Sequence, residues 1–130
     1  MERVLAIGRR KTAVAKAVAT PGNGIYRINS KLLDTLPYYV KSIISEPLVL
    51  IGDEAKKFDV SVKVKGGGIY SQAEAARTAI CKALCRLNKN LTKKILEYDR
   101  SFLVSDMRQK EEHKQRGHGK ARAKKQKSYR

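Results

Sequence analysis

The residues of this sequence best suited to chemistry are clustered cations, and the chemistry they suit is the binding of phosphate groups. Arg9, Arg10 and Lys11 stand together between two strand-like segments, so we expect their side chains at an edge or in a loop. Arginine is well shaped for bidentate contacts with phosphate oxygens. We therefore predict that these three residues contact the phosphates of RNA; an ordinary charged turn is the alternative.

Three consecutive glycines, Gly66, Gly67 and Gly68, separate a strand-like segment from a helix-like one. Glycine allows close backbone approach to a phosphate, and a helix N-terminus offers free N–H groups. The spacing differs from G-x-x-x-x-G-K-[ST], so it does not predict a nucleotide site. Two interpretations stay open, an RNA backbone contact and a tight turn, and nearby cations favour the contact: Lys63, Lys65, Arg77, Lys82 and Arg86.

The C-terminal segment is the most basic part of the chain. Residues 108–130 carry ten Lys or Arg against two Glu, a net charge of +8, and from His113 onward only alanines and one tyrosine offer apolar surface. We predict that this segment is disordered when free and becomes ordered along RNA, where the release of counterions favours binding. A localisation signal or a solubilising tail would have a similar composition.

The pattern of acidic, cysteine and histidine residues predicts no catalytic residue, metal site or cofactor. The 12 Asp and Glu residues are scattered, without a paired-carboxylate cleft or an activated nucleophile. Cys81 and Cys85 lie four residues apart on one face of a predicted helix, where small core residues are the simplest interpretation. We therefore expect a protein that is not an enzyme and has no small-molecule substrate.

The overall composition points to a polyanionic partner. The 130 residues include 29 Lys or Arg against 12 Asp or Glu, a net charge of +17, which opposes compact folding unless a polyanion is bound. A hydrophobic content of 42% is enough for one modest core. The sequence lacks an apolar run of the roughly 18 residues that a membrane span needs, and lacks a signal-peptide layout, so we expect a cytoplasmic protein with no membrane partner.

The hydrophobic periodicity predicts one α+β domain in residues 1–107, followed by the tail in residues 108–130. Strands are expected at 4–8, 12–19, 25–28 and 58–65, with the second and third joined as a hairpin by the turn residues 20–24. Helices are expected across 30–51, interrupted at Pro37 and Pro47, then from the Ser71-Gln72-Ala73-Glu74 capping box, and at 91–98. The result is a sheet of about four strands with helices on one side.

Several motifs, ordered along nearly the whole chain, can be compared with known families. They are Gly8-Arg9-Arg10-Lys11-Thr12-Ala13; Lys63-Val64-Lys65-Gly66-Gly67-Gly68 with Gln72-Ala73 and Arg77; Asp106-Met107-Arg108; Glu111; Lys120-Ala121-Arg122; and Gln126-Lys127-Ser128-Tyr129-Arg130. Together they resemble the universal small-subunit ribosomal protein S-nine family. The ending Ser128-Tyr129-Arg130 is similar to its archaeal and eukaryotic branch, and the short N-terminus favours an archaeal source.

This resemblance implies a fold, a location and partners. The implied fold is that of the second domain of ribosomal protein S-five, a four-stranded sheet with helices on one face and a left-handed βαβ crossover, with the tail extended from it. The implied place is the head of the small ribosomal subunit. The implied partners are the 3′ major domain of the small-subunit ribosomal RNA, other head proteins and the P-site transfer RNA.

The resemblance and the cation pattern together define the expected site residues. Those expected to contact ribosomal RNA are Arg9, Arg10, Lys11, Lys65, Gly66, Gly67, Gly68, Gln72, Arg77, Arg108, Lys114, Arg116, Lys120, Arg122, Lys124 and Lys125. Those expected to contact the P-site transfer RNA are Lys127, Ser128, Tyr129 and Arg130. Two other classes of function are weighed against this one: an RNA-processing enzyme or its protein cofactor, and a basic regulatory or chromatin-associated binder.

Overall fold

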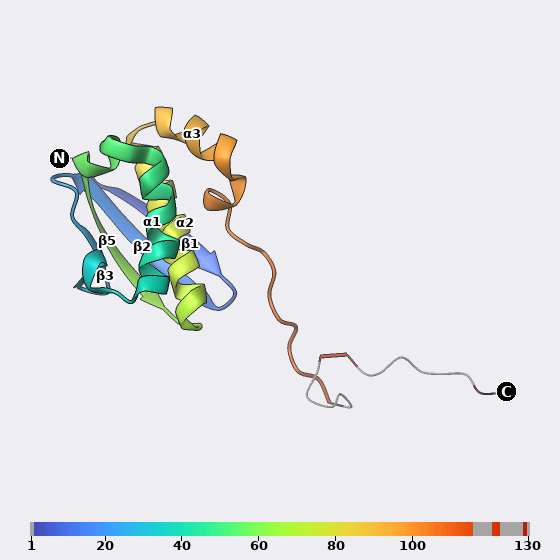
Figure 1. Cartoon of the computed structure of the whole chain (residues 1–130). Coiled ribbons are helices and arrows are strands. Elements are labelled where there is room, and N and C mark those ends of the chain that lie inside the picture. The colour runs from blue at the N-terminus through green and yellow to red at the C-terminus, as the bar shows by residue number, and fades with distance from the viewer. Residues whose placement is uncertain (1, 116–120, 123–128, 130) are drawn as a thin grey trace.

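A five-stranded mixed sheet with helices on one face forms the folded part of the chain in the computed structural model, which describes residues 2–115, 121–122 and 129 (Figure 1). The strands are β1 (Val4–Arg10), β2 (Ala13–Pro21), β3 (Tyr26–Ile28), β4 (Lys31–Leu32) and β5 (Phe58–Lys65), in the sheet order β1-β2-β5-β3-β4. The helices are α1 (Tyr38–Ile51), α2 (Ile69–Leu87) and α3 (Asn90–Tyr98), with the short 3₁₀ turns η1 (Leu33–Thr35), η2 (Gly52–Lys57) and η3 (Arg100–Phe102). After η3, residues 104–115 lead away from the domain without regular structure (Figure 1). The described helices include none that is both long and apolar enough to cross a membrane.

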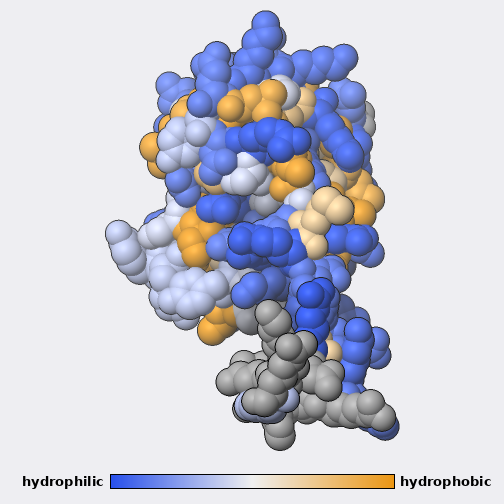
Figure 2. All heavy atoms as spheres, turned by 90° about the vertical axis from the view of Figure 1, so that its right-hand side faces the viewer, coloured by the Kyte–Doolittle hydropathy of each residue, from blue (hydrophilic) through white to orange (hydrophobic). Residues whose placement is uncertain are grey.

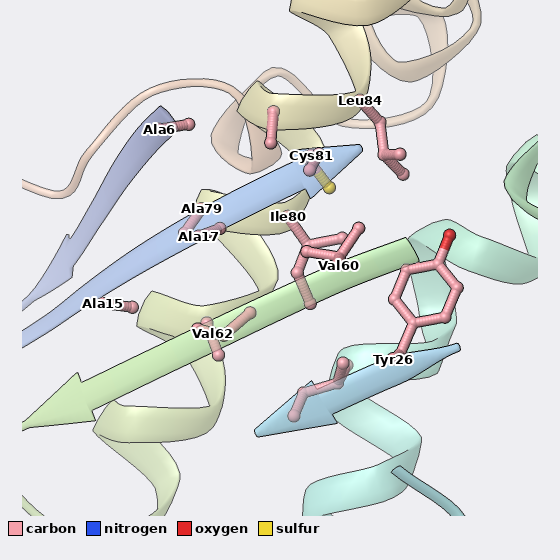
Figure 3. Packing of buried hydrophobic residues seen from close by; sticks show 14 of the residues in the cluster. Ala6, Ala15, Ala17, Tyr26, Val60, Val62, Ala79, Ile80, Cys81 and Leu84 are labelled. Atoms are coloured by element: carbon pink, nitrogen blue, oxygen red, sulfur yellow. The ribbon is translucent and has the colours of Figure 1, made fainter. Parts of the chain in front are cut away.

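Small side chains allow α2 to lie close to the sheet. Period-two alternation buries one face of β2, formed by Ala13, Ala15, Ala17 and Ala19, and these residues face a helix that is itself rich in buried alanine. Figure 3 shows Ala15 and Ala17 on the strand side and Ala79, Ile80 and Leu84 on the helix side of this core. The core is therefore thin between α2 and the β1–β2 hairpin.

Gly8 marks the closest approach of α2 to β1. A Cβ atom at this position would lie 2.3 Å from the carbonyl oxygen of Ala75 and 2.6 Å from the amide nitrogen of Ala79. Both atoms belong to the helix backbone, so neither can rotate out of the way. A side chain at residue 8 would have to push α2 off the sheet.

The prediction of a hairpin between β2 and β3 is wrong. The turn after Pro21 carries the chain across the beginning of β5, and β3 pairs with β5 in parallel. Asp59 fixes this crossing because its carboxylate accepts the backbone N–H groups of Asn23 and Ile25, both at 2.9 Å. These bonds, that of Ile25 foremost, lower the pKa of Asp59.

Other predicted boundaries also need correction. The sheet has five strands instead of four, because Lys31–Leu32 pairs with β3 as a short edge strand. Pro47 does not interrupt α1: it lies inside the helix and is buried together with Ile44 and Ile51, so the packing of this face outweighs the lost hydrogen bond. By contrast, the predicted strand at 58–65 is confirmed as β5, and the helix expected at 91–98 is confirmed as α3, which begins one residue earlier.

We predict that Gly8→Ala lowers the free energy of unfolding by about 1–3 kcal/mol, the usual cost of overpacking. The measurement is equilibrium urea denaturation. Gly68→Ala is the control, because a Cβ at Gly68 meets nothing within 4 Å; its effect should stay below about 1 kcal/mol. Equal effects of the two substitutions would show that α2 does not need its close approach to β1.

Candidate nucleic-acid interface

The basic triplet is divided among three environments instead of forming one loop. β1 continues through Arg10, with Arg9 opposite Val14 and Arg10 opposite Ala13, so the predicted break at these residues is wrong. Alternation along the strand exposes Arg9 and leaves Arg10 half-buried. Lys11 begins the turn to β2 with a left-handed backbone (φ 52°) and is exposed.

Arg10 connects β1, α2 and the start of the C-terminal segment. Its guanidinium forms ion pairs with Glu74 of α2, at 2.7 Å, and with Asp106. Asp106 in turn accepts the backbone N–H of Arg108 at 2.8 Å and pairs with its guanidinium at 2.9 Å. These bonds hold the segment beside the β1–β2 turn at the point where it leaves the domain.

The glycine loop packs against the same turn. Gly66 and Gly67 have φ of 79° and 70°, a left-handed region that disfavours other residues. A Cβ on Gly66 would lie 2.8 Å from the carbonyl oxygen of Thr12, and one on Gly67 would lie 3.0 Å from Ala13. The side-chain amide of Gln72 donates to the Gly66 carbonyl at 3.1 Å. Gly66 and Gly67 thus serve a tight turn, and only Gly68 faces open space at its Cβ position.

The predicted capping box at Ser71 is wrong, because α2 begins earlier. Gly68 is the N-cap residue, and the first hydrogen bond of the helix runs from the Gln72 N–H to the Gly68 carbonyl at 2.9 Å. The first turn has no acidic residue and no side-chain cap. This end of α2, beside exposed Lys11 and Lys65, is therefore electrostatically suited to an anion.

An open groove of about 450 Å³ brings together four of the predicted site residues. We call it the arginine groove; it is lined by Arg9, Arg10, Arg77 and Arg108, together with Arg100. Its acidic lining residues in the described chain are Glu74 and Asp106. Figure 2 views the molecule from the side of η3 and the C-terminal segment, where hydrophilic residues dominate and hydrophobic ones form small separate patches. Five arginines against two carboxylates leave this groove positive.

Arg77 has a partly structural role within the groove. Its guanidinium lies over the ring of Phe102, 4.6 Å from the centroid, and its Nη1 is 3.4 Å from Glu46. The Nε atom is buried without a hydrogen-bond partner. Arg77 therefore ties α2 to α1 and η3 while one side of it faces the groove.

Lys82 and Arg86, two of the cations expected to favour an RNA contact at the glycine loop, reach the outer edge of β1 instead. Lys82 donates to the Ile7 carbonyl at 3.0 Å and to the Ser105 hydroxyl at 2.8 Å, and Arg86 donates to the Leu5 carbonyl. Burial, together with the charges of Arg86 and Arg9, lowers the pKa of Lys82. These two cations occupy carbonyl groups of an edge strand that could otherwise pair with another chain.

The structure describes only part of the predicted tail. Lys114 is exposed, and Arg122 forms an ion pair with Glu111 at 2.7 Å. Tyr129 is 87% exposed. Outside the described residues lie Arg116, Lys120, Lys124, Lys125, Lys127, Ser128 and Arg130.

The cysteines fit the interpretation as small core residues. Cys81 is fully buried, and burial raises the pKa of its thiol to about 12, which disfavours a reactive thiolate. Cys85 packs half-buried against the same core. Within the described ranges, no group of three or more His, Cys, Asp or Glu could hold a metal ion.

Sequence reasoning missed the residues that organise the arginine groove. Arg100 was not singled out, and Glu74 was assigned to a capping box although its carboxylate holds Arg10. Asp106 appeared only as part of a family motif. Its partner Arg10 lies far away in the sequence, so no local spacing reveals the pair.

We predict that Asp106→Asn loosens the segment after η3, because it removes the charge that Arg10 and Arg108 share. Limited trypsin digestion with mass spectrometry should show several-fold faster cleavage after Arg108, with global stability changed by about 1 kcal/mol or less. Asp34→Asn, which removes the exposed ion pair between Asp34 of η1 and Lys41 of α1, is the matched control and should leave cleavage after Arg108 unchanged. Equal cleavage in both variants would contradict the anchoring role of Asp106.

Comparison with known proteins adds to this geometry. The family model described as ribosomal protein S9/S16 matches residues 8–130. A small ribosomal subunit protein uS9 of Methanococcus maripaludis is 46% identical over 134 residues, covering all of both chains. Those of Thermoplasma acidophilum and Thermoplasma volcanium are 46% and 47% identical, covering 98% and 100% of this chain and all of their own. The chain therefore belongs to the ribosomal protein S9/S16 family and is of the archaeal type.

Proposed function

We propose that this protein is a structural constituent of the small ribosomal subunit that binds ribosomal RNA in the head. The observation that carries the proposal is the arginine groove, which lies where the basic C-terminal segment leaves the domain. A phosphate backbone seated there would meet the groove, the β1–β2 turn and the segment together. The name of the uS9 relatives, small ribosomal subunit protein, supports a place in that subunit, and with it a cytoplasmic location.

The folded domain supplies the first set of contacts in this proposal. Arg9, Lys11 and Lys65 are exposed beside the glycine loop and can reach phosphates directly. Arg10 and Arg77 are already engaged by carboxylates, so they position the groove as much as they bind RNA. Phosphate contacts of this kind fix the register of a protein on RNA without reading its sequence.

The C-terminal segment supplies the second set of contacts. We propose that Lys114, Arg122 and the cations around them follow ribosomal RNA, and that Lys127, Ser128, Tyr129 and Arg130 contact the P-site transfer RNA. An exposed tyrosine can stack on a base or a ribose, and this contact accepts any sequence. That tolerance suits a site through which every transfer RNA passes.

The finer fold assignment belongs to the same proposal. β3 and β5 are parallel neighbours joined by a connection that contains α1. This unit is compatible with the fold of the second domain of ribosomal protein S-five. We propose that its crossover is left-handed, against the usual right-handed rule, because the family resemblance implies it.

The proposal assigns the chain no catalytic residue and no cofactor. The S9/S16 family is one of ribosomal structural proteins. The further partners of this chain would then be the neighbouring proteins of the subunit head, which bind the same RNA. In the arginine groove both lining carboxylates, Glu74 and Asp106, are engaged by Arg10.

We predict that deletion of residues 127–130 leaves incorporation into small subunits intact but weakens retention of P-site transfer RNA. The deletion removes two cations and Tyr129, whose proposed contacts serve the transfer RNA and not the docking of the domain. Filter binding of transfer RNA to purified subunits measures retention, and gradient sedimentation measures incorporation.

The matched control is Lys89→Gln with Lys93→Gln, which also removes two positive charges, here from exposed positions on or next to α3. It should retain transfer RNA as the unaltered chain does. Loss of incorporation in the deletion variant would show that the terminus is needed for assembly. Unchanged retention of transfer RNA would remove that contact from the proposal.

A further inference from the structure

The face of the sheet opposite α1 and α2 is open in the described part of the chain. Both helices pack on the same side of the strands (Figure 1), and the outward positions of β1, β2 and β5 are largely exposed. Leu5 is 53% exposed, and Ile7 and Val18 are each 37% exposed. We call this surface the open sheet face.

Cations lie side by side on the open sheet face. The β2–β5 register places Lys16 directly opposite Lys63, and the next outward row contains Val14 opposite Lys65, with Arg9 across from Val14. Arg27 of β3 lies opposite Ser61 of β5. The described acid at this face is Asp59, and its carboxylate is occupied by the N–H groups of Asn23 and Ile25.

The pairing of Lys16 with Lys63 is unfavourable in the free chain. Like charges directly opposite one another on neighbouring strands destabilise a sheet, and the net charge of +17 adds to the repulsion. A polyanion bound across both lysines would offset their mutual repulsion, because each lysine would then be attracted to phosphate. The arrangement is therefore expected in a protein whose working state has phosphates on this face.

The other side chains of the face indicate which polyanion fits. Its apolar residues are aliphatic, namely Leu5, Ile7, Val14 and Val18, and no aromatic side chain stands among the described outward positions of β1, β2 and β5. Binding of single-stranded RNA relies on aromatic rings that stack on bases. A surface with cations and aliphatic groups suits the wide, shallow minor groove of an RNA duplex, where riboses and phosphates are displayed.

We propose that the open sheet face is a second RNA-binding surface, which holds the backbone of a ribosomal RNA duplex through Lys16, Lys63, Lys65 and Arg27. It rests on the proposed function, because the RNA is that of the same subunit. The face adjoins the arginine groove at Arg9, so the two surfaces would bind RNA on adjacent sides of β1. The domain would then bind RNA independently of its tail.

The test compares two double variants of the full chain with equal net charge. Lys16→Gln with Lys63→Gln alters the open sheet face, and Lys89→Gln with Lys93→Gln alters the region of α3, which packs against α1, α2 and η3. Binding to a transcript of the 3′ major domain is measured across a salt series, with hydroxyl-radical footprinting. The slope of log affinity against log salt should become shallower by about 2 in the sheet variant alone, with loss of protection over a duplex segment.

Thermal melting of the free variants separates binding from folding. The sheet variant should melt at or above the temperature of the α3 variant, because it removes a repulsive cross-strand pair. Melting clearly below the control would show that the two lysines support the fold, and would overturn the proposal.

The outcomes also separate this inference from the proposed function. If the unaltered chain does not prefer the transcript to an unrelated structured RNA, both fail. If it does, and the sheet variant keeps the slope and the footprint of the unaltered chain, ribosomal RNA binding stands and the second surface is rejected. The face would then be left for an acidic protein partner or for none.

Discussion

The close contact between α2 and the β1–β2 hairpin is the constraint on which the rest of the structure depends. It exists because alanines face alanines across the core and because Gly8 leaves room for the helix backbone. With α2 in this position, Glu74 reaches Arg10, and the glycine loop before the helix rests on the β1–β2 turn. The arginine groove follows from these contacts. Packing of apolar residues thus decides where the charges lie.

Acidic residues in this basic protein act as supports for arginine. Glu74 and Asp106 hold Arg10, and Glu46 holds Arg77, so contacts within the folded chain already position these guanidinium groups. Each pair is partly shielded from solvent, but the groove keeps an excess of positive charge. Preorganisation of this kind lowers the entropy lost when a phosphate is bound. Residues 104–115, which lead away from the domain, carry further cations in Arg108, Lys110 and Lys114.

Local patterns in the sequence predicted the elements well where one face of an element is buried. The alternation in Phe58–Lys65 and the small residues of β2 are examples, because burial itself imposes the period. The β3 pairing could not be predicted in this way: a turn of Pro, Gly and Asn looks the same whether the chain folds back or crosses β5. Contacts remote in sequence decide it, as the bonds of Asp59 to Asn23 and Ile25 show. The same limit applies to the candidate site. The clustered cations can be recognised in the sequence, but the acids that pair with them cannot, because those pairs form between residues remote in sequence.

The claim that this chain is an integral part of the small ribosomal subunit is tested most directly by sedimentation. Cell lysate would be fractionated on a sucrose gradient, and the chain quantified against ribosomal RNA in each fraction. We predict stoichiometric co-sedimentation with small subunits that survives a high-salt wash, because in the proposed function the domain and the tail both bind ribosomal RNA. A position among free proteins or other ribonucleoprotein particles would contradict the account.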